Sequence, residues 1–198
     1  MVFSELSVPG AYLITPKVHR DERGSFVAPY TAAAFAEATG RELPLGQGHF
    51  STSRCGTIRG IHYADVPSGQ AKLVCCPGGA IRDFVVDLRL GSPTFGQWDS
   101  VRLDAASGKA VYLEEGLGHA FVALADGTVT AYLNSTEYNP RVEHEVDPFD
   151  TALGLDWPAD LPPLVSRRDR DAPSLAEARR AGLLPTYRAC LALPWRRR

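Results

Sequence analysis

The sequence predicts an all-β fold, an antiparallel sandwich or barrel. From residue 46 onward, short runs of strand-forming residues recur at roughly ten-residue spacing, with Gly, Pro, Asp and Ser between them. No helical pattern separates these runs, which is typical of antiparallel folds. The expected strands cover residues 46–53, 57–64, 71–76, 80–89, 96–103, 110–115, 119–125 and 128–135.

Before this region the chain predicts three shorter elements. The apolar run at residues 11–14 ends at a proline and predicts an edge strand. Residues 21–24 predict a turn that leads into a strand at 25–28. Thr31 and Gly40 bracket an alanine-rich segment as a helix cap and a helix stop would.

The C-terminal part differs in composition from the strand region. Residues 145–173 are rich in Pro and Asp, and residues 173–182 predict a short helix with a proline start and a glycine stop. We expect residues 1–198 to form a single domain, with 145–198 as a Pro-rich and helical extension that packs on the barrel. The arginine-rich end, 195–198, predicts a solvated tail.

Composition and charge narrow the class of protein. The 198 residues are 44% hydrophobic and 22% charged, with a net charge of −2, so we expect neither a nucleic-acid partner nor a membrane partner. No apolar run approaches the roughly 20 residues that span a bilayer, and the N-terminus has no signal-peptide pattern. The four cysteines contain no CxxC pair, which favours free thiols in the cytoplasm over a zinc site.

The stretch from residue 58 to residue 74 carries three groups of different chemistry. Arg59, His62 and Lys72 lie in two apolar runs that a Pro/Gly loop joins. Gly60 lies among them, and a glycine within a strand indicates that something approaches its backbone closely. A guanidinium and an ammonium suit a phosphate, and an imidazole suits proton transfer near neutrality. We therefore favour a functional site over the simpler interpretation, a half-buried hairpin with a polar face.

Further polar residues occur at strand positions. Asp83 and Asp87 share one face of their predicted strand, and an ionised aspartate facing a core is costly without a partner. One of them is therefore expected to make a buried hydrogen bond, with His119 as a candidate partner. Spacing alone leaves other interpretations open: both aspartates could face water, His119 could be a satisfied histidine, and Tyr132 could be a core tyrosine.

Several motifs in a fixed order resemble the dTDP-4-dehydrorhamnose 3,5-epimerase family. They include Arg-Gly-x-Phe at 23–26, Arg-Gly-Ile-His-Tyr at 59–63, Gln-x-Lys-Leu-Val at 70–74, Gly-His-Ala-Phe at 118–121, Tyr-Asn-Pro at 138–140 and Ser-x-Arg-Asp at 166–169. The resemblance implies a cupin-type antiparallel jelly-roll barrel with a few short peripheral helices. It also implies a homodimer formed by strand exchange or sheet extension, and a dTDP-4-keto-6-deoxyhexose substrate. It implies no metal and no other cofactor.

The resemblance also implies roles for individual residues. In the catalytic set, His62 is the base, Asp169 its partner, Tyr132 the acid and Lys72 the group that stabilises an enolate. The residues expected to bind the substrate are Arg23, Phe26, Gln47, His49, Arg59, Asp83, His119 and Tyr138. Within that set, Arg59 and His119 are expected to hold the diphosphate, with Arg23 reaching in from the partner subunit.

Three positions depart from the family's pattern. Ala28 stands where a Glu is usual, His49 where an Asn is usual, and Ala120 where a Gly is usual. These changes resemble the branch that epimerises deoxysugar intermediates of antibiotic biosynthesis, in which only C3 or only C5 is inverted.

Two other functions remain open at this point. A metal-dependent, dioxygenase-like cupin could use His49, His62 and His119 as a three-nitrogen site, although no His-x-His pair with a following Glu is present at His62. A non-catalytic nucleotide-sugar binder is the second alternative. The combination of a base and an acid favours the epimerase over both.

Overall fold

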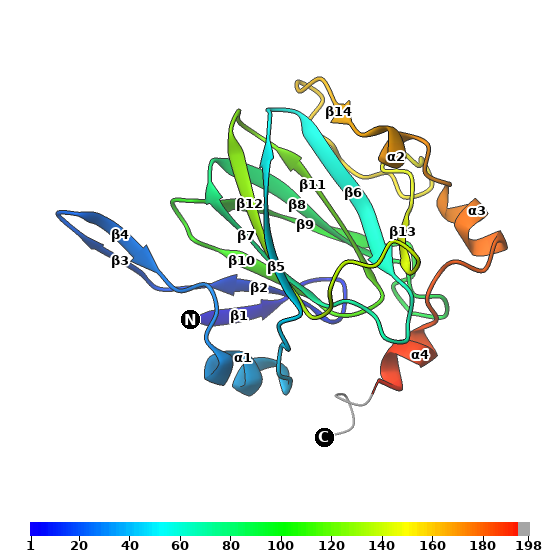
Figure 1. The fold of residues 1–198 in the computed structure, drawn as a ribbon, viewed down its shortest axis with the longest axis horizontal. Helices are drawn as coiled ribbons and strands as arrows, with labels where there is room; N and C mark the ends of the chain where they lie inside the picture. The colour runs from blue at the N-terminus through cyan, green and yellow to red at the C-terminus, as the bar shows by residue number, and fades with distance from the viewer. Residues whose placement is uncertain (194–198) are drawn as a thin grey trace.

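Two β-sheets face each other in a computed structural model that describes residues 1–193 (Figure 1). The first sheet has the order β1 (Val2–Glu5), β2 (Ala11–Thr15), β10 (Ala110–Leu113), β7 (Lys72–Gly78), β12 (Thr128–Asn134) and β5 (Gln47–Ser53). The second has the order β13 (Glu143–Glu145), β6 (Thr57–Ala64), β11 (Leu117–Ala123), β8 (Ala80–Asp87) and β9 (Trp98–Asp104), with β14 (Leu164–Val165) pairing parallel to β6. The predicted all-β fold is confirmed, with the sheets arranged as a sandwich that is not closed into a barrel.

A buried apolar layer lies between the sheets. Val74 and Leu113 from the first sheet pack in one cluster with Ile81, Val85 and Phe121 from the second. These residues alternate with outward-facing ones along their strands, as the period of two in a β-strand requires. The layer fixes the register of both sheets, because a shift by one residue would turn every apolar side chain away from it.

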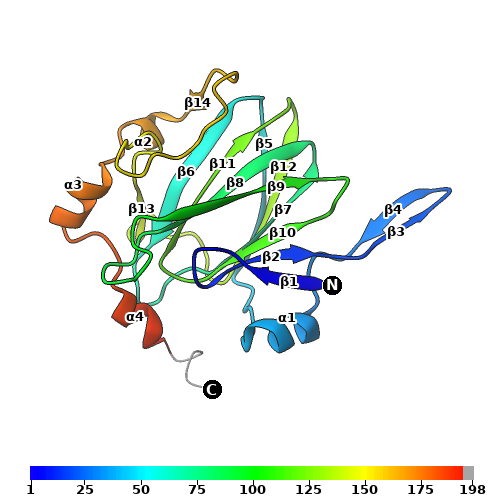
Figure 2. The same ribbon diagram turned by 180° about the vertical axis from the view of Figure 1, so that it is seen from behind.

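The C-terminal segment covers the outer face of the second sheet (Figure 2). It contains α2 (Arg167–Arg170), α3 (Leu175–Arg180) and α4 (Tyr187–Leu191). Leu175 and Ala178 of α3 pack in a cluster with Phe84 of β8, and the ring centroid of Trp157 lies 4.4 Å from that of Phe84. Strands β8 and β11 are consequently buried on both faces.

The predicted helices are present where the cap residues placed them. Helix α1 (Ala32–Thr39) follows Thr31 and ends at Gly40, which adopts the left-handed conformation. Its buried Phe35 packs on Tyr112 at a centroid distance of 4.7 Å and covers the outer face of the first sheet. Helix α3 lies within the predicted range 173–182, but its N-cap is Ser174, in a capping box with Glu177, and Pro173 precedes the cap instead of starting the helix.

One strand prediction was wrong in its position within the sheet. Residues 11–14 do form strand β2, but β2 lies between β1 and β10 and is not an edge. The edge is β1, a short and mostly exposed strand without apolar alternation. Its formation depends on pairing with β2, which its own sequence does not indicate.

A two-stranded hairpin projects from the body of the chain (Figure 1). It consists of β3 (Val18–Asp21) and β4 (Gly24–Val27), paired antiparallel around the predicted turn. Phe26, in β4 opposite His19, is 71% exposed. The hairpin thus carries an exposed aromatic side chain away from the apolar layers.

Strands β6 and β7 do not form the hairpin of the simpler interpretation, because they belong to opposite sheets. Arg59 and His62 therefore face Lys72 across the sandwich. The backbone of β11 passes so close to Gly60 that a Cβ there would collide with the carbonyl of His119. This is the close approach that the strand glycine predicted.

Two remaining predictions concern the ends of the chain and the membrane. Within residues 1–193, no helix is long and apolar enough to cross a lipid bilayer. The arginine-rich end, 195–198, lies outside the described residues.

Candidate functional site

A cavity of about 750 Å³ opens between the two sheets. Its walls come from β5, β7 and β12 on one side and from β6 and β11 on the other, and β13 and residues 163–170 complete the rim. The volume is in the range of small-molecule sites. Nine of the twelve predicted site residues line it: Gln47, His49, Arg59, His62, Lys72, His119, Tyr132, Tyr138 and Asp169.

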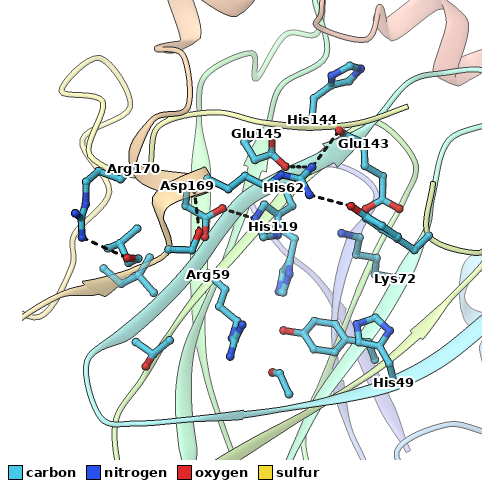
Figure 3. A pocket seen from close by; sticks show the side chains of 18 of the residues that line it. His49, Arg59, His62, Lys72, His119, Glu143, His144, Glu145, Asp169 and Arg170 are labelled. Carbon is cyan, nitrogen blue, oxygen red and sulfur yellow. Dashed lines mark hydrogen bonds and ion pairs between the residues drawn. The ribbon is translucent and has the colours of Figure 1, made fainter. Parts of the chain in front are cut away.

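A histidine–aspartate pair lies at the centre of the cavity wall (Figure 3). Nε2 of His62 on β6 lies 2.7 Å from Oδ1 of Asp169 on α2, and Asp169 is 3% exposed. Ser166 caps α2 by accepting the backbone N–H of Asp169, which fixes the carboxylate beneath the imidazole. A carboxylate that accepts Nε2–H leaves the Nδ1 lone pair of His62 as the basic atom.

The environment keeps Asp169 ionised. Burial opposes its charge, but the hydrogen bond and charge of His62 outweigh burial, so the pKa of Asp169 is lowered overall. An ionised Asp169 stabilises the imidazolium that forms when His62 takes a proton. The pair is therefore suited to general-base catalysis.

Lys72 supplies a cation from the opposite sheet. It begins β7, is 7% exposed and lines the cavity. Burial lowers the pKa of Lys72, and the nearby charges of Glu143 and Asp83 raise it. Glu143 is itself held by Gln70 Nε2 at 3.3 Å and by the backbone N–H of Asn139 at 3.2 Å.

A second buried histidine–aspartate pair lies beside the first. Nε2 of His119 is 2.7 Å from Oδ2 of Asp83, and His119 is the direct cross-strand neighbour of His62. The buried hydrogen bond expected from the strand pattern is thus confirmed. Asp83 is fully buried and lies behind His119, not on the cavity wall. Asp87 is fully buried as well, bound to Arg89 at 2.8 Å.

Tyr132 enters the cavity from β12 in the first sheet, the sheet opposite His62. It is 8% exposed, and burial raises the pKa of its phenol. The hydroxyl is therefore protonated at neutral pH, which is the form that a proton donor needs.

Arginine side chains line the cavity. Arg59 donates from Nε to Ser53 Oγ at 3.3 Å and remains exposed, and Arg54 and Arg170 also line the cavity. Arg170 is anchored to the carbonyl of Val165 at 3.4 Å. Several guanidinium groups at one cavity favour a phosphate-bearing ligand.

Tyr138 stands at the rim, 51% exposed, and two contacts fix it. Its backbone N–H donates to Oε1 of Gln47 at 2.7 Å, and its hydroxyl accepts from Arg168 at 2.9 Å. Arg168 also pairs with Glu145. An exposed ring held at both ends is suited to stacking on a planar group.

Arg23 and Phe26 are not part of this cavity in the single chain. Both belong to the projecting hairpin, where Arg23 forms an exposed ion pair with Asp21 at 2.6 Å. Their predicted contact with the substrate would require the hairpin of a second subunit.

Comparison with known proteins identifies the family. Residues 5–177 match the family model for dTDP-4-dehydrorhamnose 3,5-epimerase. The chain belongs to this family.

Curated relatives and solved structures agree with this assignment. The chain is 53% identical to dTDP-4-dehydrorhamnose 3-epimerase of Streptomyces niveus, over 95% of this chain and 90% of the relative. It is 49% identical to dTDP-4-dehydrorhamnose 3,5-epimerase of Mycolicibacterium smegmatis, over 97% and 94% of the two chains. NovW, a 4-keto-6-deoxy sugar epimerase from the novobiocin gene cluster of Streptomyces spheroides, superposes with a TM-score of 0.94 at 52% identity, covering 96% and 95%. ChmJ, a 3′-monoepimerase from Streptomyces bikiniensis solved with dTDP-quinovose, gives 0.91 at 48% identity, covering 93% of each chain.

Membership in the epimerase family supports the epimerase prediction over the two alternatives. Among residues 1–193, no three His, Cys, Asp or Glu side chains are gathered as a metal site requires. Nε2 of His62 and Nε2 of His119 are each engaged by an aspartate. The site geometry and the relatives favour proton transfer at a keto-sugar.

Some lining residues of this epimerase site were not predicted: Glu143, Glu145, Arg168 and Arg170 of β13 and α2. Glu143 lies just before the part described from the sequence as rich in Pro and Asp, residues 145–173, and the other three lie within it. Arg168 belongs to the Ser-x-Arg-Asp motif, so that motif was the available signal. Nothing in the local pattern indicates the glutamates, because β13 has three residues and no apolar alternation.

Proposed function

We propose that the chain inverts C3, C5 or both in a dTDP-4-keto-6-deoxyhexose, through an enolate, in deoxysugar biosynthesis. One observation carries the proposal: a carboxylate-backed histidine and a protonated tyrosine enter one cavity from opposite sheets, with a buried lysine on its wall. Base and acid on opposite faces are what inversion at a carbon requires.

In the first step, Nδ1 of His62 takes the proton from the carbon next to the C4 ketone. The C–H electron pair forms a C=C bond to C4, and the π electrons of the carbonyl move onto the ketone oxygen, which gives the enolate. Asp169 stabilises the imidazolium at a distance of 2.7 Å. The ammonium of Lys72 stabilises the enolate oxygen, and its charge is worth most in a site shielded from water.

In the second step, Tyr132 donates its hydroxyl proton to the opposite face of the same carbon. The enolate collapses to the ketone, and the tyrosine becomes a phenolate. The phenolate then regains a proton from solvent, and the imidazolium of His62 releases one. No oxidant or reductant takes part.

Other residues that line the cavity are assigned to the nucleotide. Arg59 and His119 hold the diphosphate, together with Arg170, which the sequence did not predict, and Tyr138 stacks on thymine. The side-chain oxygen of Gln47 supports Tyr138 by accepting the backbone N–H of Tyr138.

Arg23 and Phe26 complete the site if the chain forms a homodimer. The hairpin that carries them projects from the body, and the Phe26 side chain is 71% exposed, so a second subunit can reach it. We therefore place the hairpin of one subunit over the cavity of the other. Phe26→Ala should weaken dTDP affinity at least tenfold, a loss that a single aromatic anchor can account for. Unchanged affinity, measured by calorimetry together with subunit mass by light scattering, would contradict this role.

All four cysteines are free, which supports a reducing compartment such as the cytoplasm. The decisive experiment is incubation with dTDP-4-keto-6-deoxyglucose in deuterated water. NMR should locate deuterium at C3, C5 or both, with a new epimer formed. Binding of dTDP without exchange would favour the non-catalytic binder. Activity lost on chelation and restored by iron or zinc would favour the metal-dependent alternative.

A further inference from the structure

His49 lies directly against the proposed acid. It is on edge strand β5, where it is the cross-strand partner of Tyr132 on β12. The two rings are stacked, with centroids 4.6 Å apart and an angle of 13° between their planes. Figure 3 shows His49 in the lower part of the view, below Lys72.

A second imidazole holds the tyrosine from another direction. The ring of His119 meets Tyr132 edge-on, with centroids 5.9 Å apart and an angle of 83°. His119 is itself fixed by its hydrogen bond to Asp83. The Tyr132 ring is thus held between one rigid histidine edge and the face of His49.

Among the described residues, Nδ1 of His49 is buried without a hydrogen-bond partner. Burial, and after it the charge of Lys72, lowers the pKa of His49, so the imidazole is neutral at neutral pH. A neutral ring can lie flat on a phenol next to a lysine without adding a second positive charge.

We propose that His49 is a positioning residue that fixes the Tyr132 hydroxyl for reprotonation and so commits the enolate to inversion. The inference rests on the proposed function, because it assigns His49 a part in the second proton transfer only. Proton abstraction by His62 occurs on the opposite sheet and does not involve His49. Loss of the stack should therefore separate exchange from inversion.

The test compares His49→Ala with His49→Phe in deuterated water. Ala removes the stacking face, whereas Phe keeps the face and removes both nitrogens. In His49→Ala, the epimer formed per exchange event should fall about 10- to 100-fold, the scale of loss for a misplaced reacting group. His49→Phe should keep most of the wild-type ratio of epimer formed to deuterium exchanged.

A matched control is His144→Ala. His144 also borders the cavity, but its Nε2 is bound to Asp65 at 2.8 Å and its ring lies 5.5 Å from Tyr63. Its ratio of inversion to exchange should equal that of wild type. Equal dTDP affinity in all variants would show that each is folded.

Two results would overturn the positioning role. The first is a ratio of inversion to exchange in His49→Ala equal to that of wild type. The second is a ratio that His49→Phe fails to restore, which would assign the effect to a nitrogen of His49 and not to its ring face. Absence of exchange in wild type would instead overturn the proposed function and this inference with it.

Discussion

Asp169→Asn tests the base most directly. The substitution keeps the size of the side chain and one acceptor oxygen, and it removes the negative charge 2.7 Å from Nε2 of His62. The amide can still hold the ring in place, so the change isolates the charge. The imidazolium formed in the first step would lose its nearest counter-charge.

The size of the effect follows from the contact. Hydrogen bonds to charged groups contribute about 1.5–3 kcal/mol. Asp169 is 3% exposed, so solvent screening takes little from this value. Each 1.36 kcal/mol in a barrier is a factor of ten, so exchange should slow by roughly 10- to 200-fold.

The assay is the initial rate of deuterium incorporation, with dTDP affinity measured in parallel. The matched control is Asp65→Asn, which removes a carboxylate 2.8 Å from Nε2 of His144. The control should exchange at the wild-type rate. Exchange in Asp169→Asn within twofold of wild type would refute the assignment of His62 and Asp169 as the base pair.

Four further outcomes are expected. Tyr132→Phe should keep exchange at the carbon that His62 reaches and lower inversion by about 10²–10⁴-fold; parallel loss of both in the NMR assay would contradict a donor role. Burial lowers the pKa of Lys72 overall, although the charge of Glu143 raises it. Activity should therefore fall at alkaline pH as Lys72 loses its proton, at a pH below the ordinary lysine pKa of about 10.4. Glu143→Gln should shift this alkaline limb of the activity profile to lower pH. An unmoved limb in the kcat profile would argue against the coupling. Asp87→Asn should destabilise the fold by about 3–5 kcal/mol at pH 7, because Arg89 is left buried without its carboxylate. Burial opposes ionisation of Asp87, but hydrogen bonds, first from Arg89, lower its pKa overall in the folded protein. The stability that ionised Asp87 contributes is therefore complete above its pKa in the unfolded chain, about 3.9. It is lost as the pH falls through its lower pKa in the folded protein. Urea unfolding at pH 7 and pH 3 should therefore show a smaller difference between wild type and variant at pH 3. Exhaustive chelation should leave turnover unchanged, because Lys72 supplies the cation; loss of turnover restored by added metal would oppose this.

The strands could be predicted because they depend on local patterns. Each expected run from residue 46 onward overlaps a strand of the structure, and the turn at 21–24 and the end of α1 at Gly40 follow from turn and cap chemistry. The acidic alternation also predicted the His119–Asp83 bond, since an aspartate on a core-facing strand needs a partner. In these cases a short segment contains the whole physical reason.

The sheet order could not be predicted in the same way. Strand β1 exists because β2 pairs with it, and β6 and β7 lie in opposite sheets although a short loop joins them. The His62–Asp169 contact joins residues that are 107 positions apart. Only the family resemblance placed these two together, because no local pattern encodes a contact of that separation.

The arrangement of charge in the cavity explains how a chain with a net charge of −2 can suit a diphosphate sugar. Asp169 lies behind His62 and Asp83 behind His119, and the charge of Glu143 acts on Lys72. Asp83 does not line the cavity and the carboxylate of Asp169 is engaged by His62, while the basic groups line the cavity together with several arginines. The field at the substrate is therefore set by local pairing and not by net charge. It follows that neutralising a backing carboxylate should change catalysis more than neutralising an exposed one, which is the contrast between Asp169→Asn and Asp65→Asn.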